Sequence, residues 1–379
     1  MRSKKEWARF VAVLLLGLLF AQTIASARLK SPTIDEPDHL VQGYAYLKTG
    51  DLRLRTQPPP LVNAINALPL LTLPGVKLPT DDLSWIQADR PRFVDMFLWQ
   101  VNDNAGQLIF LGRISTILLT VLLGAFVFRW ARDLFGSHAA LLALFLFAFD
   151  PNILAHARLI TTDLGMTTFS FLAVYALWRS LHKEAWHDVI LSGVALGLAL
   201  TAKFSALFLV PLFCILVLWW AITRRTLFPL LVLLAIFVLA SFTLWAVYGF
   251  EVGPLDVGGL PLPAPYYLRG VWDVLRLVEG GNPTFLMGHY STTGWWYYFP
   301  IAFLVKTPIP TMLFLLAALL STALRRTWQR DIFLLLPMAA LFGVTLFSHL
   351  NIGYRHLLPA LPFAFVYTCL LYTSPSPRD

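Results

Sequence analysis

The chain has 379 residues, of which 58% are hydrophobic and only 13% are charged, whereas soluble domains are roughly half apolar and about one quarter charged. This composition excludes an ordinary soluble domain and predicts an all-α, multi-pass membrane protein. The formal net charge of +8 does not predict a nucleic-acid partner, because the basic residues form small clusters between apolar runs rather than one stripe. Two cysteines, Cys214 and Cys369, are too few for a disulfide framework or a zinc site.

The N-terminal segment is predicted to cross the membrane once. Several basic residues precede an uncharged run from Phe10 to Ala27, which is long enough for about 27 Å of helix. The alternative is a signal peptide cleaved after Ala25–Ala27. Both interpretations place the N-terminus inside and residue 28 onward outside, and we expect a retained span because the run is longer than a usual signal core.

Residues 28–107 are predicted to form one long outer loop. The segment is polar and proline-rich, and its apolar run Leu61–Val76 contains two asparagines and two prolines, which make it a poor span. We expect short amphipathic helices that lie on the membrane surface.

Nine further apolar segments follow, so we expect about ten spans. They lie at residues 108–128, 138–156, 164–181, 187–202, 204–222, 227–249, 299–320, 332–349 and 357–371. The loops assigned to the inner side carry Arg129 and Arg132, Arg179 and Lys183, Arg224 and Arg225, and Arg325, Arg326 and Arg330. This alternation follows the positive-inside rule.

A second large outer loop is predicted at residues 251–298. Its residues Trp295, Trp296 and Tyr297 are suited either to the membrane interface or to the face of a bound sugar. We interpret residues 1–368 as a single transmembrane domain. Residues 369–379 break the apolar pattern with a Ser/Pro segment; we expect a non-native tail on a chain that lacks its C-terminal part, the alternative being a genuine polar tail.

The unusual acids come directly after the first span. Asp35, Glu36, Asp38 and His39 lie within five residues, and on a helix that begins near Asp35 the carboxylates share a face with His39. One carboxylate could act as a general base while its neighbour tunes the pKa. The alternative is that Asp35 is only a helix N-cap before Pro37.

The bases converge on the same predicted side. Arg158, Lys203, Lys306 and Arg355 lie at outer boundaries of apolar segments and would together suit a lipid phosphate; any single lysine there could instead extend toward the interface. A divalent cation is also possible, held by Asp35, Glu36, His39 and Asp163, although no cofactor is expected to be required.

Five segments carry a resemblance to a known family. They are Thr33–His39 (TIDEPDH) with Gly43–Asp51 and Pro58–Leu61, Arg158–Asp163 (RLITTD), Gly197–Lys203 (GLALTAK), Gly294–Pro300 (GWWYYFP) with Lys306–Pro308, and Gly353–Pro359 (GYRHLLP). In this order they resemble the bacterial phospholipid-carrier-dependent glycosyltransferases, which are relatives of the protein O-mannosyltransferases and of the lipid A aminoarabinose transferases. The resemblance covers essentially the whole chain.

The resemblance implies a GT-C fold and a membrane glycosyltransferase of the bacterial cytoplasmic membrane. A sugar would pass from a polyprenyl phosphate to an extracytoplasmic acceptor, which could be a protein Ser/Thr, a lipid or a cell-envelope glycan, with inversion at the anomeric carbon. Asp35 would be the base, Glu36 its partner and Asp163 a second acid. The resemblance also implies that four bases surround the donor phosphate, namely Arg158, Lys203, Lys306 and Arg355. His39, His356, Trp295, Trp296 and Tyr297 are candidate substrate contacts.

A multi-pass transporter or lipid flippase is the rival interpretation. Transporters place ionisable residues near the middle of broken helices, often in repeated halves. Here the predicted spans are nearly free of such charges, and the polar residues lie in two unequal outer loops. The depth of each ionisable residue in the bundle distinguishes the two functions.

Overall fold

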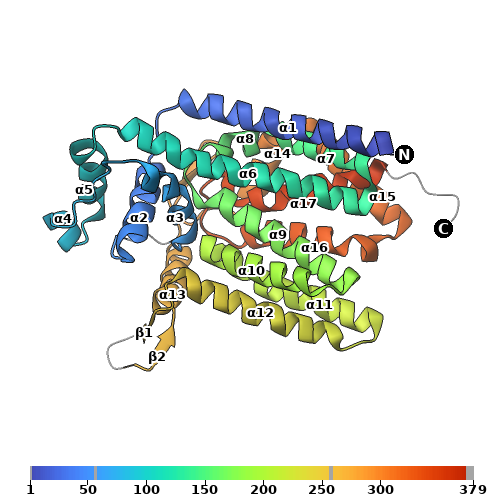
Figure 1. Cartoon of the computed structure of the whole chain (residues 1–379). Helices are drawn as coiled ribbons and strands as arrows, with labels where there is room; N and C mark the ends of the chain where they lie inside the picture. Colours follow the sequence, from blue (N-terminus) through green and yellow to red (C-terminus); the bar gives the residue numbers. More distant parts are fainter. Residues whose placement is uncertain (1, 55–57, 256–258, 373–379) are drawn as a thin grey trace.

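Long helices lie side by side in the computed structural model, which describes residues 2–54, 58–255 and 259–372, and a group of shorter helices gathers at one end of the bundle (Figure 1). The bundle contains α1 (Arg2–Arg28), α6 (Ala105–Phe135), α7 (Ser137–Ala148), α8 (Pro151–Ala157), α9 (Thr162–Lys183), α10 (Trp186–Ala202), η3 (Phe204–Phe208), α11 (Leu209–Arg224), α12 (Phe228–Val247), α14 (Tyr298–Lys306), α15 (Ile309–Arg325), α16 (Trp328–Leu346), η4 (Tyr354–His356), η5 (Leu358–Ala360), α17 (Leu361–Thr368) and η6 (Cys369–Tyr372). The predicted helix bundle is therefore confirmed.

The first outer loop folds into short helices against the end of the bundle. They are α2 (Asp35–Thr49), α3 (Leu61–Ala67), η1 (Leu68–Thr72), α4 (Leu83–Ile86), α5 (Arg90–Asp95) and the π-helical turn η2 (Met96–Val101). The apolar run after Leu61 forms only twelve helical residues, about 18 Å at 1.5 Å per residue, which is too short to cross a bilayer. The Tyr46 hydroxyl donates to the Val247 carbonyl at 2.6 Å and fixes α2 to the end of α12.

The second loop differs from the expected all-helical pattern. It contains two short antiparallel hairpins, β1 (Val252–Pro254) with β2 (Pro261–Pro263) and β3 (Thr284–Leu286) with β4 (His289–Ser291), on either side of α13 (Pro265–Gly280). Gly and Pro are frequent here and disfavour longer helices. Tyr267 of α13 packs on Phe204 with ring centroids 5.3 Å apart, so α13 rests directly beside Lys203.

Fewer helices than expected meet the length and hydropathy of a membrane span. Within the described chain five helices qualify, or up to seven if each of two bent pairs counts as one span, compared with about ten expected segments. The shortfall includes α10, which has 17 residues, and α9, whose 22 residues include Asp163 and several buried hydroxyl residues. These apolar helices nevertheless make the chain an integral membrane protein.

Two predicted spans are broken. The segment 138–156 bends by 61° between α7 and α8, and the segment 299–320 bends by 115° between α14 and α15. Each break contains or adjoins a proline: Pro151 begins α8, and Pro308 lies between α14 and α15. The residue before a proline is driven toward extended backbone. Thr307 indeed has φ −82° and ψ 134°. The predicted span 299–320 is therefore not one continuous helix, and Lys306 lies at its break.

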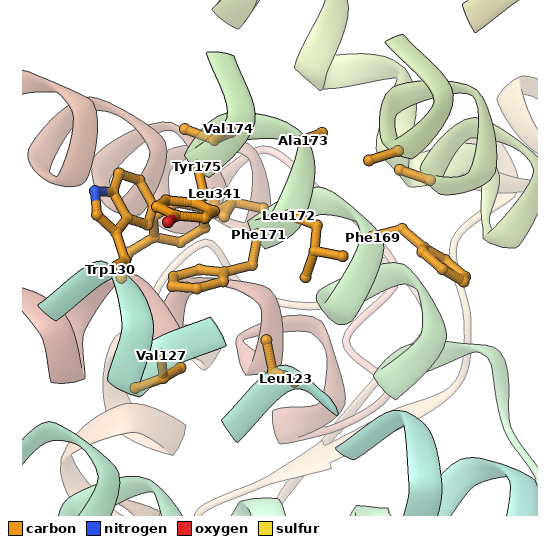
Figure 2. Packing of buried hydrophobic residues seen from close by; sticks show 14 of the residues in the cluster. Leu123, Val127, Trp130, Phe169, Phe171, Leu172, Ala173, Val174, Tyr175 and Leu341 are labelled. Carbon is orange, nitrogen blue, oxygen red and sulfur yellow. The ribbon is translucent and has the colours of Figure 1, made fainter. Parts of the chain in front are cut away.

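The core that holds the long helices together is aromatic. Trp130 of α6 is fully buried and packs on Phe171 and Tyr175 of α9, with ring centroids 5.1 and 5.4 Å away (Figure 2). Phe363 of α17 closes the cluster 5.0 Å from Phe171. Close approach elsewhere depends on glycine, because a Cβ on Gly197 of α10 would meet the Ala240 carbonyl of α12.

The two ends of the bundle differ in charge. Helix α9 has Asp163 in its first turn and ends at Lys183, α11 ends at Arg224 and α15 ends at Arg325. The basic residues assigned to inner loops therefore lie at the end opposite Asp35, where the N-terminus of α1 also lies (Figure 1). This arrangement agrees with the predicted topology, which itself stays a prediction.

The expected boundary at residue 369 does not coincide with the end of the packed structure. Cys369 and Leu370 are buried, and the Cys369 thiol lies 3.0 Å from the Ala139 carbonyl. Residues 373–379, which carry most of the predicted tail, lie outside the described residues.

We expect Gly43→Ala to destabilise the protein by about 1–3 kcal/mol, because a Cβ at Gly43 would overlap the Asn63 backbone carbonyl of α3 and overpacking costs energies of this order. Gly17→Ala is the matched control, since nothing lies within 4 Å of its Cβ position. Thermal unfolding in detergent measures the difference; equal melting temperatures for the two variants would contradict the close packing of α2 on α3.

Candidate active site

Asp35 begins α2 and faces an arginine from the far end of the sequence. Its Oδ2 accepts a hydrogen bond at 3.0 Å from Arg355, and the carboxylate is 44% exposed. The alternative of an N-cap was wrong: the N-cap is Ile34, and no side chain caps the helix. Asp35 therefore has no capping function and remains accessible beside a cation.

Asp163 forms a second acid–base pair with Lys203. Asp163 lies in the first turn of α9, and Lys203 lies in extended backbone between α10 and η3. The ammonium donates to Asp163 Oδ1 at 2.6 Å. Burial raises the pKa of this carboxyl, but the charge of Lys203, followed by that of Arg355, outweighs burial and lowers the pKa below its usual value. Asp163 is consequently ionised at neutral pH.

Three histidines surround these two pairs. His39 Nδ1 bonds to Asn63 Oδ1 at 2.9 Å, and burial lowers the pKa of its ring although the Asp35 charge opposes the shift. His356 stacks on Phe299 at 5.8 Å. His156 of α8 lies close enough to Asp163 for its charge to act on the ring. The site is thus built from α2, α8, α9, η4 and the residue before η3. These elements come from the beginning, the middle and the end of the chain.

Some buried polar atoms of the cluster have no hydrogen-bond partner. Among the described residues these atoms include Arg355 Nε, His356 Nε2 and His156 Nδ1. Native proteins leave few such atoms unsatisfied. The combination of unsatisfied polar atoms and two cations indicates a site prepared for a polar, anionic ligand.

Lys306 reaches the same region from the break between α14 and α15. Its carbonyl accepts a hydrogen bond at 3.0 Å from Asn152 of α8, and its charge acts on His156. The Thr307 hydroxyl lies 2.7 Å from the Tyr354 hydroxyl, next to Arg355 in the chain. The break therefore places Lys306 beside the cluster, as the sequence predicted.

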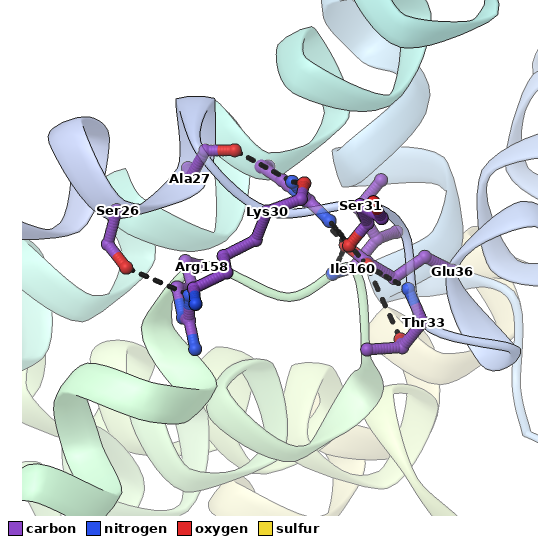
Figure 3. Close-up of polar contacts among 9 residues, drawn as sticks. Ser26, Ala27, Lys30, Ser31, Thr33, Glu36, Arg158 and Ile160 are labelled. Atoms are coloured by element: carbon purple, nitrogen blue, oxygen red, sulfur yellow. Dashed lines mark hydrogen bonds and ion pairs between the residues drawn. The ribbon is translucent and has the colours of Figure 1, made fainter.

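Glu36 is buried and fully hydrogen-bonded. Both oxygens accept hydrogen bonds from Arg113, at 2.8 and 2.7 Å, and the backbone amides of Thr33 and Ile160 also donate, at 2.8 and 3.1 Å (Figure 3). Burial alone would raise the pKa of Glu36. The hydrogen bonds, first that from Arg113, have the larger effect, so the pKa lies below its usual value. Every bond that Glu36 accepts here comes from the protein itself.

Arg113 holds the site together and, like His156, was not predicted from the sequence. All five of its N–H donors are used: two on Glu36 and three on the carbonyls of Ala27, Lys30 and Ser31. A lone arginine inside a predicted apolar span is itself a signal of a buried partner. Arg113 ties the end of α1 and the start of α2 to α6, and so fixes Asp35.

Two sets of predicted residues lie outside this inner cluster. Arg158 donates to the Ser26 hydroxyl at 2.8 Å, beside the Arg113 contacts (Figure 3). Trp296 is 69% exposed and packs edge-on against Tyr297, while the Trp295 amide bonds to Asn351 Oδ1 at 2.6 Å.

The possible metal ligands are occupied by cations of the protein. Across the described ranges no group of three or more His, Cys, Asp or Glu side chains could hold a metal ion. Glu36, Asp163 and Asp35 instead pair with Arg113, Lys203 and Arg355. The predicted ligand set is thus not brought together.

Acid is expected to destabilise the fold through His356. Burial, and then the charge of Lys203, lowers the pKa of His356 to about 3 from 6.5. As the pH falls below 6.5, His356 takes up a proton in the unfolded state but not in the folded state. The contribution of neutral His356 to folding stability is therefore present above pH 6.5 and is lost as the pH falls toward 3. Thermal unfolding at pH 7.5 and pH 5 should show the loss, and His356→Asn should reduce it; an unchanged pH dependence in the variant would contradict the assignment.

Part of the chain matches the model of a known protein family. Residues 89–246 match the model of the family described as dolichyl-phosphate-mannose-protein mannosyltransferase, a range that contains Arg113, Asp163 and Lys203 but not Asp35 or Arg355. No curated protein matches the sequence. The chain therefore shows the predicted resemblance to GT-C glycosyltransferases in its central part.

Solved structures extend this likeness to the whole chain. ArnT from Cupriavidus metallidurans bound to undecaprenyl phosphate matches with a TM-score of 0.57 and 14% identity, over 98% of this chain and 61% of ArnT. The archaeal oligosaccharyltransferase AglB from Archaeoglobus fulgidus, in complex with an inhibitory peptide and a dolichol-phosphate, matches with a TM-score of 0.58 and 14% identity, over 97% of this chain and 50% of AglB. The chain has the GT-C fold and spans about three fifths of the length of ArnT.

Proposed function

We propose that the chain is a membrane glycosyltransferase that moves a sugar from a polyprenyl-phosphate donor to an acceptor outside the cytoplasm. Its site would be the cluster around Asp35 and Asp163, on the outer face of the membrane. The similar solved structures support a lipid-phosphate donor, because ArnT is bound to undecaprenyl phosphate and AglB to a dolichol-phosphate.

The observation that carries this proposal is the arrangement of cations around unsatisfied polar atoms. Lys203 and Arg355 are each held by one carboxylate, at 2.6 and 3.0 Å, while Arg355 Nε and His356 Nε2 are buried without partners. A phosphate would supply acceptors for these donors and receive both positive charges. Lys306 would add a third charge as a point contact.

The same groups account for the chemistry of transfer. Asp35 would accept the proton of an acceptor hydroxyl as that oxygen attacks the anomeric carbon. The bond between the anomeric carbon and the phosphate oxygen breaks, and the lipid phosphate leaves with the bonding electrons. Lys203 and Arg355 would stabilise the negative charge that develops on the phosphate. Attack opposite the leaving group inverts the anomeric centre.

A bound phosphate would also release the base. In the structure Arg355 is engaged by Asp35. When the guanidinium turns toward a donor phosphate, the half-exposed Asp35 carboxylate becomes free to receive a proton. Asp35 would thus become active only when the donor is bound.

The remaining predicted residues divide by what they contact. Glu36 is proposed as a positioning residue, because Arg113 and backbone amides use its oxygens. Asp163 is proposed to hold Lys203, since the carboxylate remains ionised. Arg158, which bonds to Ser26, would reach a phosphate only after that bond breaks. His39 and Trp295 remain proposed substrate contacts.

The positions of buried charges favour an enzyme over a transporter. The buried charged residues of the described chain are Glu36, Arg113, Asp150, Asp163, Asp188 and Asp331. Glu36, Asp163, Asp188 and Asp331 lie in the first turn of a helix, and Asp150 lies between α7 and α8. Arg113 lies inside α6, but it is paired with Glu36 at 2.7 Å. A transport path would require charges at mid-depth.

Lys203→Met is expected to raise the KM for the lipid donor by about 10- to 100-fold, because a charge-assisted contact of about 1.5–3 kcal/mol is lost. Lys203→Arg should restore part of the affinity. The measurement supplies polyprenyl-phosphate sugars to membranes that contain the chain and quantifies the released polyprenyl phosphate by mass spectrometry. An unaltered KM in Lys203→Met would remove the lysine from the phosphate site, and no release from any donor would contradict the proposed activity.

A further inference from the structure

The end of the bundle opposite Asp35 contains a cavity. A cavity of about 450 Å³ lies between the last turn of α9, the last turn of α11 and the first turn of α12. Its lining includes His182, Trp220, Arg224, Thr226 and Phe228. Ligand sites commonly have volumes of about 300–1,000 Å³, so the cavity can hold a small ligand or the head group of a larger one.

Arg224 is prepared for an anion in this cavity. Its guanidinium lies over the Trp220 ring, 4.9 Å from the centroid, and His182 packs against Trp220 at 4.4 Å. His182 is itself fixed by the bond between its Nδ1 and the Trp178 carbonyl, at 2.7 Å. The cation is thereby held in place without being neutralised, which lowers the entropic cost of binding.

Arg224 lacks an ionic partner, unlike its neighbour on α9. In the part of the chain that the structure describes, Arg179 pairs with Asp188 at 3.0 Å, whereas Arg224 forms no ion pair. Glu184 is the one carboxylate among the residues that line the cavity, and the adjacent Lys183 and Arg225 more than balance its charge. The cavity is therefore suited to an anionic group.

The surroundings of the mouth identify the kind of anion. Ile222, Leu227 and Leu231 are 75%, 76% and 62% exposed beside it. Only 17% of the most apolar stretch of α12 is buried inside the protein, so acyl chains already lie along this helix in a membrane. A soluble phosphate would gain no binding energy from these apolar side chains. A lipid would contact Arg224 with its head group and the apolar side chains with its acyl chains.

We propose that this cavity binds the phosphodiester head group of an anionic phospholipid through Arg224. Basic pockets between membrane helices are known to take such head groups on the cytoplasmic side, where the basic end of this bundle is predicted to lie. The site is separate from the Asp35 cluster and does not depend on the proposed sugar transfer.

The test is lipid retention by the whole chain. Nanodiscs of phosphatidylcholine with a minor fraction of phosphatidylglycerol are dissolved gently, and native mass spectrometry counts the lipids that stay bound. Arg224→Gln is compared with Arg325→Gln, because both arginines are exposed and end a helix at the same end of the bundle. Both are surface substitutions, so both variants should fold.

We expect Arg224→Gln to reduce the retained phosphatidylglycerol about ten-fold, as for the loss of one charge-assisted contact, and Arg325→Gln to retain it like the wild type. Soluble glycerol phosphate at millimolar concentration should not displace the lipid. Unchanged retention in Arg224→Gln, an equal loss in Arg325→Gln, or displacement by glycerol phosphate would overturn the proposal.

Discussion

Asp35→Asn is expected to lower sugar transfer by about 10²–10⁴-fold, the usual contribution of a general base. The amide keeps the size of the side chain but cannot accept the proton of an acceptor hydroxyl. Asp35 is half-exposed, and its side-chain hydrogen bond to the described residues is the 3.0 Å bond from Arg355, so the fold should survive the change. Transfer is measured from a polyprenyl-phosphate sugar in reconstituted vesicles, together with the melting temperature.

Asp38→Asn is the matched control for this variant. Asp38 lies in the first turn of the same helix, and its nearest cation is Arg90, whose Nε lies 3.6 Å from Asp38 Oδ1. We expect it to retain transfer within a few-fold, because such a surface pair contributes at most about 1 kcal/mol. Full activity of Asp35→Asn, or an equal loss in both variants, would remove Asp35 from the catalytic role.

Arg113→Met is expected to destabilise the chain by about 3–5 kcal/mol, because it leaves the buried Glu36 carboxylate without its cation. The change also removes donors to the carbonyls that end α1, among them Ala27 and Lys30. The melting temperature in detergent measures the loss. Arg158→Met, which removes one bond to Ser26, should cost about 1 kcal/mol or less.

The coupling between Arg113 and Glu36 gives a stricter test. The double variant Arg113→Met with Glu36→Gln should lose less stability than the two single variants added together, since the second change neutralises the charge that the first leaves unpaired. Losses that simply add would show that the two residues act independently, against the bonds of 2.7 and 2.8 Å between them.

The sequence predicted much of the site because charge is rare in this chain. A helix from Asp35 was expected and is found, and Asp163, Lys203, Lys306 and Arg355 were expected at one end of the bundle, where they lie. In an apolar chain each ionisable residue is costly unless it has a partner. Charge and the predicted topology therefore indicated which residues would gather at one end of the bundle.

The partners themselves could not be predicted. Glu36 and Arg113 are separated by 77 positions, and Asp35 and Arg355 by 320. No local spacing encodes such contacts, so Glu36 was assigned to catalysis and Arg113 was passed over. The two helix breaks could have been predicted, because Pro151 and Pro308 signal them. Each segment was predicted as a single span because of the length of its apolar run.

The binding of polyprenyl phosphate without a sugar tests the central claim most directly, namely that Lys203 and Arg355 hold the donor phosphate while Asp35 acts on the acceptor. Affinity is measured in detergent for the wild type, Asp35→Asn, Arg355→Met and Lys203→Met. We predict that Asp35→Asn binds as tightly as the wild type or more tightly, since Arg355 is freed, and that each cation variant binds about ten-fold more weakly. Wild-type affinity in both cation variants would contradict the account.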